Sequence, residues 1–325
     1  MSIAIPPKDD IVIGFAHVAY RTAEAFSARK TGLRHFEVTS LDALRDRAPE
    51  ADVLVLSGLW RNDLVETCPR LRFVQSMSAG TDQYDKALFA AQGLRLASAQ
   101  GVNEKAVAEH AMALILALTR QLHAARDNQH ARHWRPMIGD RALREDELGG
   151  KTLVIVGMGR IGSRLARLAR AFDLRVIGIR RTARPEPGAA DEVVSLGDLP
   201  AALAQADIVA LTCPLTPETT GLIGPAALQA VKPGALLINV ARGRVVDEPA
   251  LLAALSKGRI AAAGLDCFHD EPLPADSPFW SLPNVLITPH TAGETRRYEE
   301  NVVDVLLENL NRLWRGETEL RNQIV

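Results

Sequence analysis

Residues 152–172 read TLVIVGMGRIGSRLARLARAF, an apolar run that leads directly into three glycines. A helical pattern follows at once over Arg160–Phe172. In the spacing GxGxxG, Gly157 permits the tight turn, Gly159 lets a pyrophosphate approach the backbone, and Gly162 lets the helix pack on the strand. The first turn of that helix then offers free N–H groups to the phosphates. The stretch therefore predicts a dinucleotide-binding turn, against the alternative of a glycine-rich turn with only a packing role.

The choice of dinucleotide depends on the end of the next strand, about 20 residues further on. An acid at that place usually accepts hydrogen bonds from the ribose 2′-hydroxyl of NAD. This chain has Arg180, Arg181 and Thr182 instead. Because arginine pairs with phosphate in a bidentate way, the sequence predicts a preference for NADP(H), with NAD(H) still possible. The alternative is that both arginines are solvated charges of a turn.

Short apolar runs alternate with helical patterns along the chain, which is typical of parallel sheets flanked by helices. We expect two α/β domains, each a doubly wound parallel sheet: a flavodoxin-like one from residues 1–103 plus 294–325, and a Rossmann domain from residues 104–293. The expected strands of the first are Ile11–Phe15, Asp52–Leu56, Leu71–Gln75 and Leu94–Leu96, with helices at Ala19–Lys30 and Leu41–Arg47. Those of the second are Thr152–Val156, Arg175–Ile179, Ile208–Thr212, Ala235–Asn239, Ala261–Leu265 and Val285–Thr288.

Three segments connect or complete these domains. Ala106–Leu118 is apolar on nearly every face, which predicts a fully buried helix with His110 as a hydrogen-bonded core residue. Thr119–Glu147 is polar, and we interpret it as a surface excursion that could pack on a partner subunit. Glu294–Arg315 has an amphipathic helical pattern that could return to the first domain.

The bulk properties exclude several classes of protein. The chain has 38 lysines and arginines against 39 aspartates and glutamates, so its net charge of -1 gives no reason to expect nucleic acid or an anionic membrane as a partner. No apolar run approaches the roughly 20 residues of a membrane span, and the start lacks a signal-peptide layout. The three cysteines show no metal spacing and no disulfide framework. We therefore expect a cytoplasmic protein without a metal site.

Seven motifs, in order and in spacing, resemble the D-isomer-specific 2-hydroxyacid dehydrogenase family between about Asp52 and Gly293. Besides the glycine turn they are SMSAGTDQYD at Ser76–Asp85, GVNEKAVAEH at Gly101–His110, CPLTPETTGLIG at Cys213–Gly224, NVARGRVVDEPAL at Asn239–Leu251, GLDCFHDEPLP at Gly264–Pro274 and NVLITPHTAG at Asn284–Gly293. The resemblance implies two doubly wound domains with the active site in the cleft between them, and a homodimer.

The resemblance also implies three catalytic residues. Arg242 would bind the substrate carboxylate and the reacting oxygen. His290 would be the general acid/base, and Glu271 would pair with it. The chemistry agrees, because histidine transfers protons near neutral pH and a carboxylate stabilises its imidazolium form. Arginine offers a planar, permanently charged fork to a carboxylate. Taken singly, each residue has a structural alternative: a surface arginine, one charge of an acidic loop, or a buried histidine.

Further positions match the family's binding residues. The backbone amides of Ser78, Ala79 and Gly80 resemble its carboxylate-binding loop, and Asn103 would either face the substrate or simply cap a helix. Asp266 could accept a hydrogen bond from the nicotinamide carboxamide, or be a turn residue at a strand end. His269 matches no catalytic position, so we interpret it as a loop residue. The expected cofactor contacts are Gly157, Gly159, Arg160, Ile161, Gly162, Arg180, Arg181, Thr182, Cys213, Pro214, Val240, Asp266, His290 and Gly293.

Together these features predict an NADP(H)-preferring D-2-hydroxyacid dehydrogenase. Its substrates would be small 2-keto acids such as glyoxylate or hydroxypyruvate, reduced to D-2-hydroxy acids. A phosphoglycerate dehydrogenase and a non-enzymatic NAD(P)-sensing protein on the same fold are the alternatives. A formate dehydrogenase is disfavoured, because that activity resembles a Gln–His pairing and this chain has Glu271.

Overall fold

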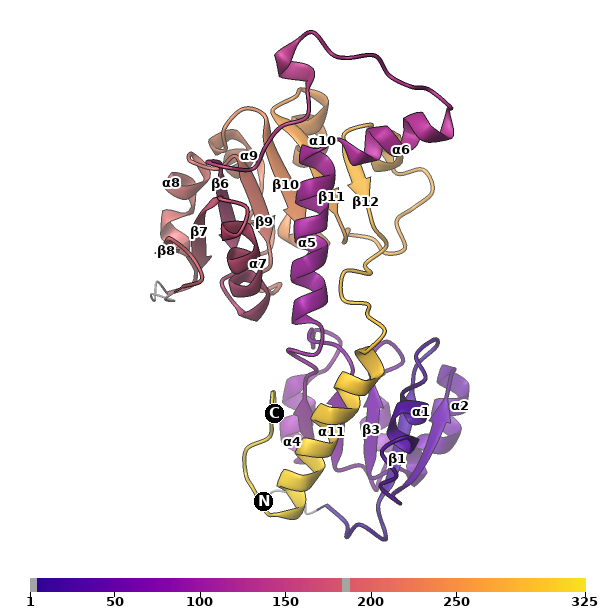
Figure 1. Cartoon of the computed structure of the whole chain (residues 1–325). Coiled ribbons are helices and arrows are strands. Elements are labelled where there is room, and N and C mark those ends of the chain that lie inside the picture. Colours follow the sequence, from indigo (N-terminus) through magenta and orange to yellow (C-terminus); the bar gives the residue numbers. More distant parts are fainter. Residues whose placement is uncertain (1–4, 183–187) are drawn as a thin grey trace. The chain divides into compact units, whose positions relative to one another are not determined.

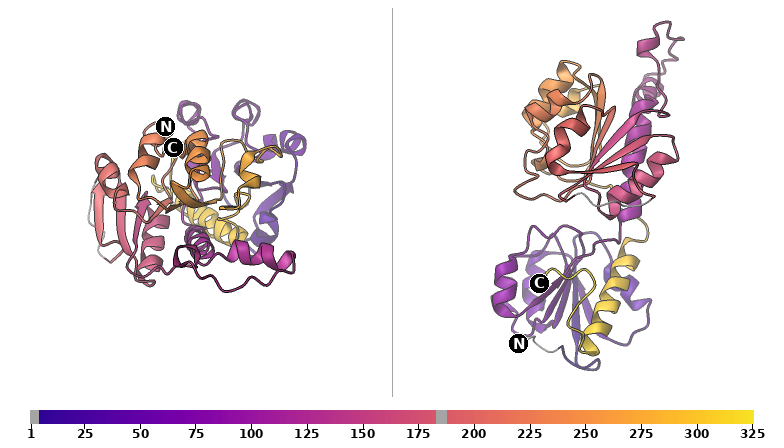
Figure 2. Two further views of the ribbon diagram at one scale, coloured as in Figure 1. Left: turned by 90° about the horizontal axis from the view of Figure 1, so that it is seen from above. Right: turned by 90° about the vertical axis from the view of Figure 1, so that its left-hand side faces the viewer.

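The computed structural model describes residues 5–182 and 188–325. The chain divides into two compact units: unit 1 comprises Met1–Asn103 and Thr295–Val325, and unit 2 comprises Glu104–Glu294. Within these described residues, each unit is built on its own parallel sheet, of five strands in unit 1 and seven in unit 2. Helices cover both faces of each sheet (Figures 1 and 2). The prediction of two parallel-sheet α/β domains is therefore confirmed.

Unit 1 has the strand order β2-β1-β3-β4-β5, which is the flavodoxin-like order. Its strands are β1 (Val12–Ala16), β2 (Arg34–Val38), β3 (Val53–Leu56), β4 (Phe73–Ser76) and β5 (Arg95–Ala97). Its helices are α1 (Thr22–Ser27), α2 (Leu41–Arg47), α3 (Leu64–Thr67), α4 (Lys86–Gln92) and α11 (Tyr298–Trp314). The sequence VLVL of β3 is buried throughout, as expected for a central strand that is covered on both faces. The C-terminal helix α11 buries Val302, Leu306 and Leu310 against this unit.

Unit 2 has the strand order β12-β11-β10-β9-β6-β7-β8. Six of these strands follow the Rossmann order, and β12 extends the sheet at one edge. They are β6 (Thr152–Val156), β7 (Arg175–Arg180), β8 (Glu192–Ser195), β9 (Ile208–Leu211), β10 (Ala235–Asn239), β11 (Ile260–Leu265) and β12 (Val285–Ile287). The helices are α5 (Glu104–Thr119), α6 (Leu122–His130), α7 (Arg160–Arg170), α8 (Leu199–Leu203), α9 (Pro225–Ala230) and α10 (Glu248–Ser256). The strand order reverses between β6 and β9, and the carboxyl ends of strands at such a point are where open α/β sheets bind ligands.

Two strands were not expected from the sequence. β2 (RHFEV) and β8 (EVVS) are the outer strands of their sheets, and both carry polar residues on their exposed positions. An outer strand is covered on fewer sides, so it needs no continuous apolar run of the kind that marks β3 or β6.

Helix α5 is less completely buried than its composition predicted. Val107, Ala108 and Ile115 are buried, whereas Ala113 is exposed and the His110 side chain retains 24% of its exposure. Beyond α5, helix α6 contributes no buried residue, and the segment that follows it lies on the surface. Among the described residues, no helix is both long enough and apolar enough to cross a membrane.

Candidate active site

The glycine turn joins β6 to α7, and two of its glycines are required by contacts within unit 2. Gly157 has a φ of 108°, and a Cβ atom on it would lie 2.5 Å from the backbone nitrogen of Cys213. A Cβ atom on Gly162 would lie 2.2 Å from the carbonyl oxygen of Gly157. The turn and the start of α7 therefore pack backbone against backbone, which any other residue at these two positions would prevent.

Gly159 differs from its neighbours, because a Cβ atom there would meet no atom of the described residues within 4 Å. The packing of the described part of unit 2 thus does not require a glycine at this position. Gly159 is the N-cap of α7, and its carbonyl accepts the first helical hydrogen bond from Ser163. The first-turn amides of Arg160 and Ile161 have no partner within the helix. Open space beside a glycine and helical N–H groups fit the pyrophosphate of a dinucleotide.

The residues predicted to select the cofactor lie at the end of β7, the next strand along the chain. Arg180 is the last residue of β7 and is half-buried, while Arg181 and Thr182 are exposed. Arg181 lies close to Glu218: the Thr216 hydroxyl is the largest cause of the lowered pKa of Glu218, and the Arg181 charge contributes to it. An acid therefore lies near these arginines, although it comes from the loop after β9 and not from the end of β7.

Cys213 and Pro214, the two positions expected beside the adenosine, lie near the start of that loop. The thiol of Cys213 is buried, which raises its pKa to about 11. The carbonyl of Pro214 accepts a hydrogen bond of 2.7 Å from the Thr219 hydroxyl, so the loop is held in a defined turn.

Arg242 lies in a turn just after the carboxyl end of β10. The side chain of Asn239, the last residue of that strand, holds this turn at both ends. Its Oδ1 accepts a hydrogen bond of 3.0 Å from the Ala241 amide, and its Nδ2 donates one of 3.0 Å to the Arg242 carbonyl. The Arg242 side chain is half-buried and donates a hydrogen bond to the Ala241 carbonyl. The buried Asn239 therefore fixes the backbone from which the Arg242 guanidinium extends.

His290 and Glu271 are brought together across 19 residues of sequence. The Nδ1 atom of His290 lies 2.7 Å from Oε2 of Glu271, and the other carboxylate oxygen accepts a hydrogen bond of 2.9 Å from the Phe268 amide. The His290 and Glu271 side chains are 43% and 37% exposed, so the pair is accessible to a small molecule. Since Nδ1 is held by the carboxylate, Nε2 is the ring atom that can exchange a proton with a ligand.

Asp266 lies at the end of β11 and is 2% exposed. Its carboxylate accepts three hydrogen bonds from the segment that carries His290: one of 2.5 Å from the Thr288 hydroxyl, and one of 3.0 Å from each of the Thr291 and Ala292 amides. Asp266 thus holds the His290 segment on both sides of the histidine. The charges of Glu271 and Asp266, after the larger effect of burial, raise the pKa of the neighbouring Cys267 thiol.

The sequence did not indicate that His110 and Thr288 belong to this network. The Nε2 atom of His110 lies 3.0 Å from the Thr288 hydroxyl and 3.7 Å from the Asp266 carboxylate. His110 therefore lies beside the His290 segment and not within the apolar core. By contrast, His269 is held in its loop by a hydrogen bond of 2.7 Å between Nε2 and the Val246 carbonyl.

In unit 1, the loop of residues 77–80 follows β4 and is organised by serine hydroxyl groups. The Ser78 amide donates a hydrogen bond of 2.9 Å to the hydroxyl of Ser57, which follows the neighbouring strand β3. The Ser78 hydroxyl in turn donates one of 2.8 Å to the Gly80 carbonyl. Within the part of the chain that the structure describes, the amides of Ala79 and Gly80 donate no hydrogen bond. The loop thus presents two amides, whereas the Ser78 amide is already used.

Trp60 and Asn103 also belong to unit 1. Trp60 is 2% exposed and packs against Tyr84 and Phe89, so it belongs to the core of unit 1. Asn103 directly precedes α5 and is half-buried, which is the place of an N-cap residue.

Comparison with known proteins identifies the family. Residues 112–292, more than half of the chain, match the model of the D-isomer specific 2-hydroxyacid dehydrogenase NAD-binding domain. The chain belongs to this family. The matched residues lie within unit 2 and include the glycine turn, Arg242, Glu271 and His290. As a D-2-hydroxyacid dehydrogenase, the protein uses a nicotinamide cofactor, to which the open space beside Gly159 is suited.

The dehydrogenase is 39% identical to the glyoxylate reductase of Aeropyrum pernix over 83% of this chain and 82% of that protein. It is 36% identical to the D-3-phosphoglycerate dehydrogenase of Mycobacterium tuberculosis over 85% of this chain, but over only 52% of that longer protein. A similar solved structure is a D-isomer specific 2-hydroxyacid dehydrogenase from Xanthobacter autotrophicus Py2, in complex with NADPH and MES. It is 27% identical, with a TM-score of 0.79 and 98% of each chain covered.

Proposed function

We propose that this dehydrogenase reduces small 2-keto acids to D-2-hydroxy acids with NADPH, and that glyoxylate and hydroxypyruvate are among its substrates. The observation that supports this most is the 2.7 Å contact of His290 Nδ1 with Glu271, in the same unit as the glycine turn and Arg242. The similarity to a glyoxylate reductase along most of both chains supports the substrate class. Unit 2 would bind the dinucleotide, and unit 1 would be the substrate domain.

In this proposal the side chains of His290, Glu271 and Arg242 have different roles. When bound, NADPH supplies a hydride to the carbonyl carbon of the keto acid. The His290 imidazolium donates a proton from Nε2 to the carbonyl oxygen, and Glu271 stabilises the positive charge that His290 carries before this step. Arg242 binds the substrate carboxylate and the carbonyl oxygen with its guanidinium. The amides of Ala79 and Gly80 also bind the carboxylate.

Different loops of unit 2 would contact different parts of the cofactor. Gly159, Arg160 and Ile161 would hold the pyrophosphate. Cys213 and Pro214 would lie beside the adenosine. Val240, Asp266 and Gly293 would lie near the nicotinamide. Because three hydrogen bonds already occupy the Asp266 carboxylate, its main task here is to hold the His290 segment, and it has room for at most one further donor such as the carboxamide.

The direct test is a panel of 2-keto acids assayed with NADPH and with NADH. We expect turnover of glyoxylate or hydroxypyruvate, and a loss of at least about 100-fold in kcat for His290→Asn, with cofactor binding retained. His35→Gln, an exposed histidine of β2, is the matched control and should leave kcat unchanged. Wild-type turnover in the His290 variant would exclude its assigned role. Tight NADP(H) binding without turnover of any keto acid would favour the cofactor-sensing alternative.

The preference for NADPH rests on Arg180 and Arg181. Replacing both by alanine should lower kcat/KM for NADPH by about tenfold or more, because two charge-assisted contacts to the 2′-phosphate are lost. The kcat/KM for NADH should change much less. Arg167→Ala, an exposed arginine of α7, is the control. Glu218 near Arg181 works against the preference. Equal use of both cofactors by the wild-type enzyme would refute it.

A phosphoglycerate dehydrogenase is the second candidate, because this chain is similar to one over 85% of its length. The two activities differ in the charge of the substrate beyond the 2-keto acid group. A kcat/KM for 3-phosphohydroxypyruvate above that for hydroxypyruvate, measured with the same cofactor, would replace the first proposal with the second.

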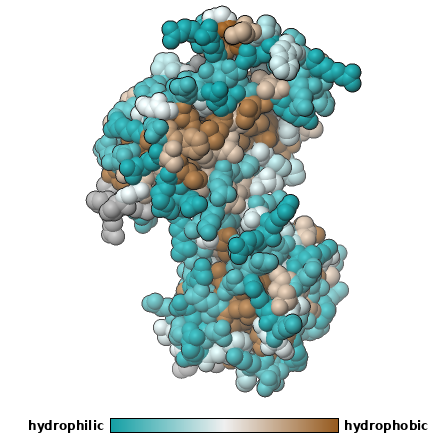
Figure 3. Space-filling model, in the orientation of Figure 1, coloured by the Kyte–Doolittle hydropathy of each residue, from teal (hydrophilic) through white to brown (hydrophobic). Residues whose placement is uncertain are grey.

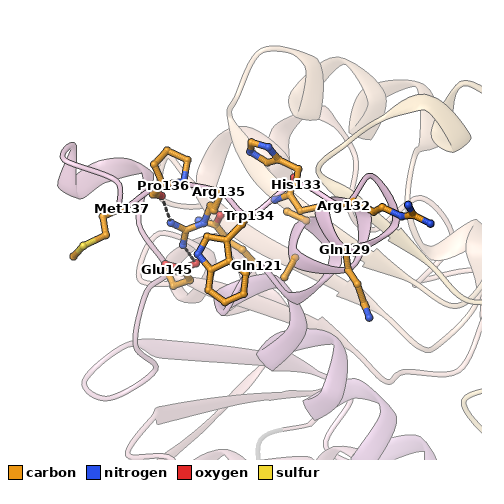
Figure 4. Close-up of a pocket in the computed structure, with 12 residues that line it drawn as sticks. Gln121, Gln129, Arg132, His133, Trp134, Arg135, Pro136, Met137 and Glu145 are labelled. Carbon is orange, nitrogen blue, oxygen red and sulfur yellow. Dashed lines mark hydrogen bonds and ion pairs between the residues drawn. The ribbon is translucent and has the colours of Figure 1, made fainter.

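We also propose that the protein is a homodimer, with the segment 120–147 and the adjacent face of α5 at the interface. Trp134 and Met137 in this segment are 97% and 98% exposed. They line a pocket of about 680 Å³. Figure 4 shows these residues together with Arg135, which pairs with Glu145. Figure 3 shows apolar side chains gathered on the face of unit 2 that carries α5. Sedimentation of wild type against a Trp134→Ser/Met137→Ser variant tests this; a monomeric wild type would refute it.

A further inference from the structure

His110 projects from α5 toward the end of β12, where the His290 segment begins. Its Nε2 atom lies 3.0 Å from the Thr288 hydroxyl oxygen, although the two residues are 178 positions apart in sequence. The same nitrogen lies 3.7 Å from Oδ1 of Asp266. His110, Thr288 and Asp266 thus form one polar cluster, which we call the His110 cluster.

The hydrogen bonds of the cluster fix the direction of each donor. Thr288 has a single hydroxyl hydrogen, which it donates to Oδ1 of Asp266 over a distance of 2.5 Å. The Thr288 oxygen must therefore accept from His110, so Nε2 of His110 carries a hydrogen. The order of donation is His110 to Thr288 to Asp266.

The cluster contacts the segment that carries His290. The hydrogen bonds of this segment restrict the backbone of His290. Asp266 binds the amides of Thr291 and Ala292 on one side of the histidine and the Thr288 hydroxyl on the other. His290 itself has a φ of 55°, a left-handed conformation that is uncommon outside glycine and needs support from its surroundings. Any loosening of the Thr288–Asp266 contact would be passed directly to the backbone of His290.

We propose that His110 is a positioning residue for His290, acting through Thr288 and Asp266; this rests on the proposed function. By donating to Thr288, His110 keeps the hydroxyl aligned with Asp266, and so holds the His290 ring where it meets both Glu271 and the reacting oxygen. His110 touches neither the substrate nor the reacting atoms. Its removal therefore affects kcat more than the KM for the keto acid, whose carboxylate is bound by other groups.

The activity test uses His110→Phe, which keeps an aromatic ring and removes the donor, and His110→Gln, whose amide nitrogen can take the place of Nε2. We expect His110→Phe to lower kcat about tenfold, with the KM for the keto acid and the Kd for NADPH changed less than about twofold. His110→Gln should restore most of the rate. Wild-type kcat in His110→Phe, or equal losses in the Phe and Gln variants, would overturn the proposal.

A double-mutant cycle separates the proposed route from simple packing. Thr288→Val removes the hydroxyl and keeps the shape of the side chain. If His110 acts through Thr288, the double variant should lose no more activity than the worse single variant, whereas independent effects would multiply. Multiplied effects, with unchanged thermal unfolding temperatures, would show that His110 does not act through Thr288.

A measurement without turnover keeps this proposal distinct from the proposed function. In protein labelled with ¹⁵N-histidine, the His110 resonances, assigned with the His110→Gln variant, should show a protonated Nε2 in the wild type. The Thr288→Val variant should shift that nitrogen and leave His269 unchanged. An unprotonated Nε2 of His110 refutes the positioning role even in an active enzyme. A protonated Nε2 in a protein inactive on all keto acids would refute only the proposed function.

Discussion

A Cβ atom placed on Gly243 would lie 1.9 Å from the carbonyl carbon of Phe268. Gly243 follows Arg242 directly, and the Phe268 amide donates a hydrogen bond to the Glu271 carboxylate. The turn that carries Arg242 therefore touches the loop that carries Glu271, backbone against backbone. The separation between the guanidinium and the His290–Glu271 pair depends on this contact, which the absence of a side chain at residue 243 makes possible.

We predict that Gly243→Ala will lower kcat/KM for the keto acid by at least about 100-fold, because the methyl group forces the two loops apart and a small misplacement costs about that much. The overlap is with backbone atoms, so no side chain can rotate away. Steady-state kinetics and the Kd for NADPH measure the effect, and cofactor binding at the distant glycine turn should persist. Gly149→Ala is the control, since a Cβ there would meet its nearest atom at 3.9 Å. Equal kinetics of the two alanine variants would contradict the prediction.

Glu271→Gln tests the charge of the pair without changing its shape. The amide can still contact the His290 ring and the Phe268 amide. It cannot stabilise the imidazolium, so we expect kcat to fall by about 100-fold or more while the Kd for NADPH stays the same. Glu248→Gln changes a carboxylate that contacts the His269 amide in the same region, and is the matched control. If both variants behave alike, the charge of Glu271 has no special role.

Ser57→Ala addresses the proposed carboxylate-binding loop of unit 1. The Ser57 hydroxyl accepts from the Ser78 amide and donates to the Ser78 hydroxyl. Its loss should leave the loop less ordered, and we expect the KM for the keto acid to rise by about tenfold with a smaller change in kcat, because binding costs the free energy of ordering the loop. Ser27→Ala, which removes an exposed hydroxyl of the same unit, should change neither constant. An unchanged KM in Ser57→Ala would count against the role of this loop.

The sequence predicted the parts of this protein whose signal is local. The glycine turn is recognisable because strand, glycines and helix follow one another within 21 residues, and its contacts at Gly157 and Gly162 are those expected. His290 and Glu271 could be selected by motif, and the structure adds that they meet at 2.7 Å.

What the sequence did not predict depends on contacts between distant segments. His110 lies in an apolar helix, and nothing nearby in sequence indicates that Thr288 is its partner. Ser57 lies directly after the end of β3, and its proposed role comes from the hydrogen bond with Ser78 in the loop after the neighbouring strand β4. The outer strands β2 and β8 were missed because their exposed faces are polar. In each case the deciding interaction is set by the sheet that brings the segments together.

The three thiols give a prediction on accessibility that can be checked without a substrate. Burial is the largest cause of the raised pKa of Cys68, of Cys213 (to about 11) and of Cys267. A thiol reacts as its thiolate, and below the raised pKa almost all of it stays protonated. We therefore expect the native protein to react slowly with a thiol reagent between about pH 7 and pH 9. The unfolded protein should show three rapidly reacting thiols, since unfolding returns the pKa of each thiol to about 8.5.

The order among the thiols is also expected. Cys267 carries the additional effect of the Glu271 and Asp266 charges, so it should react last as the pH is raised, after Cys213. In Glu271→Gln one of these charges is removed, and the labelling of Cys267, followed by peptide mass spectrometry at high pH, should become faster while that of Cys68 in unit 1 stays the same. Because both thiols remain buried in this variant, a change confined to Cys267 reports the field of Glu271. Equal rates at Cys267 in the variant and the wild type would mean that burial alone protects this thiol.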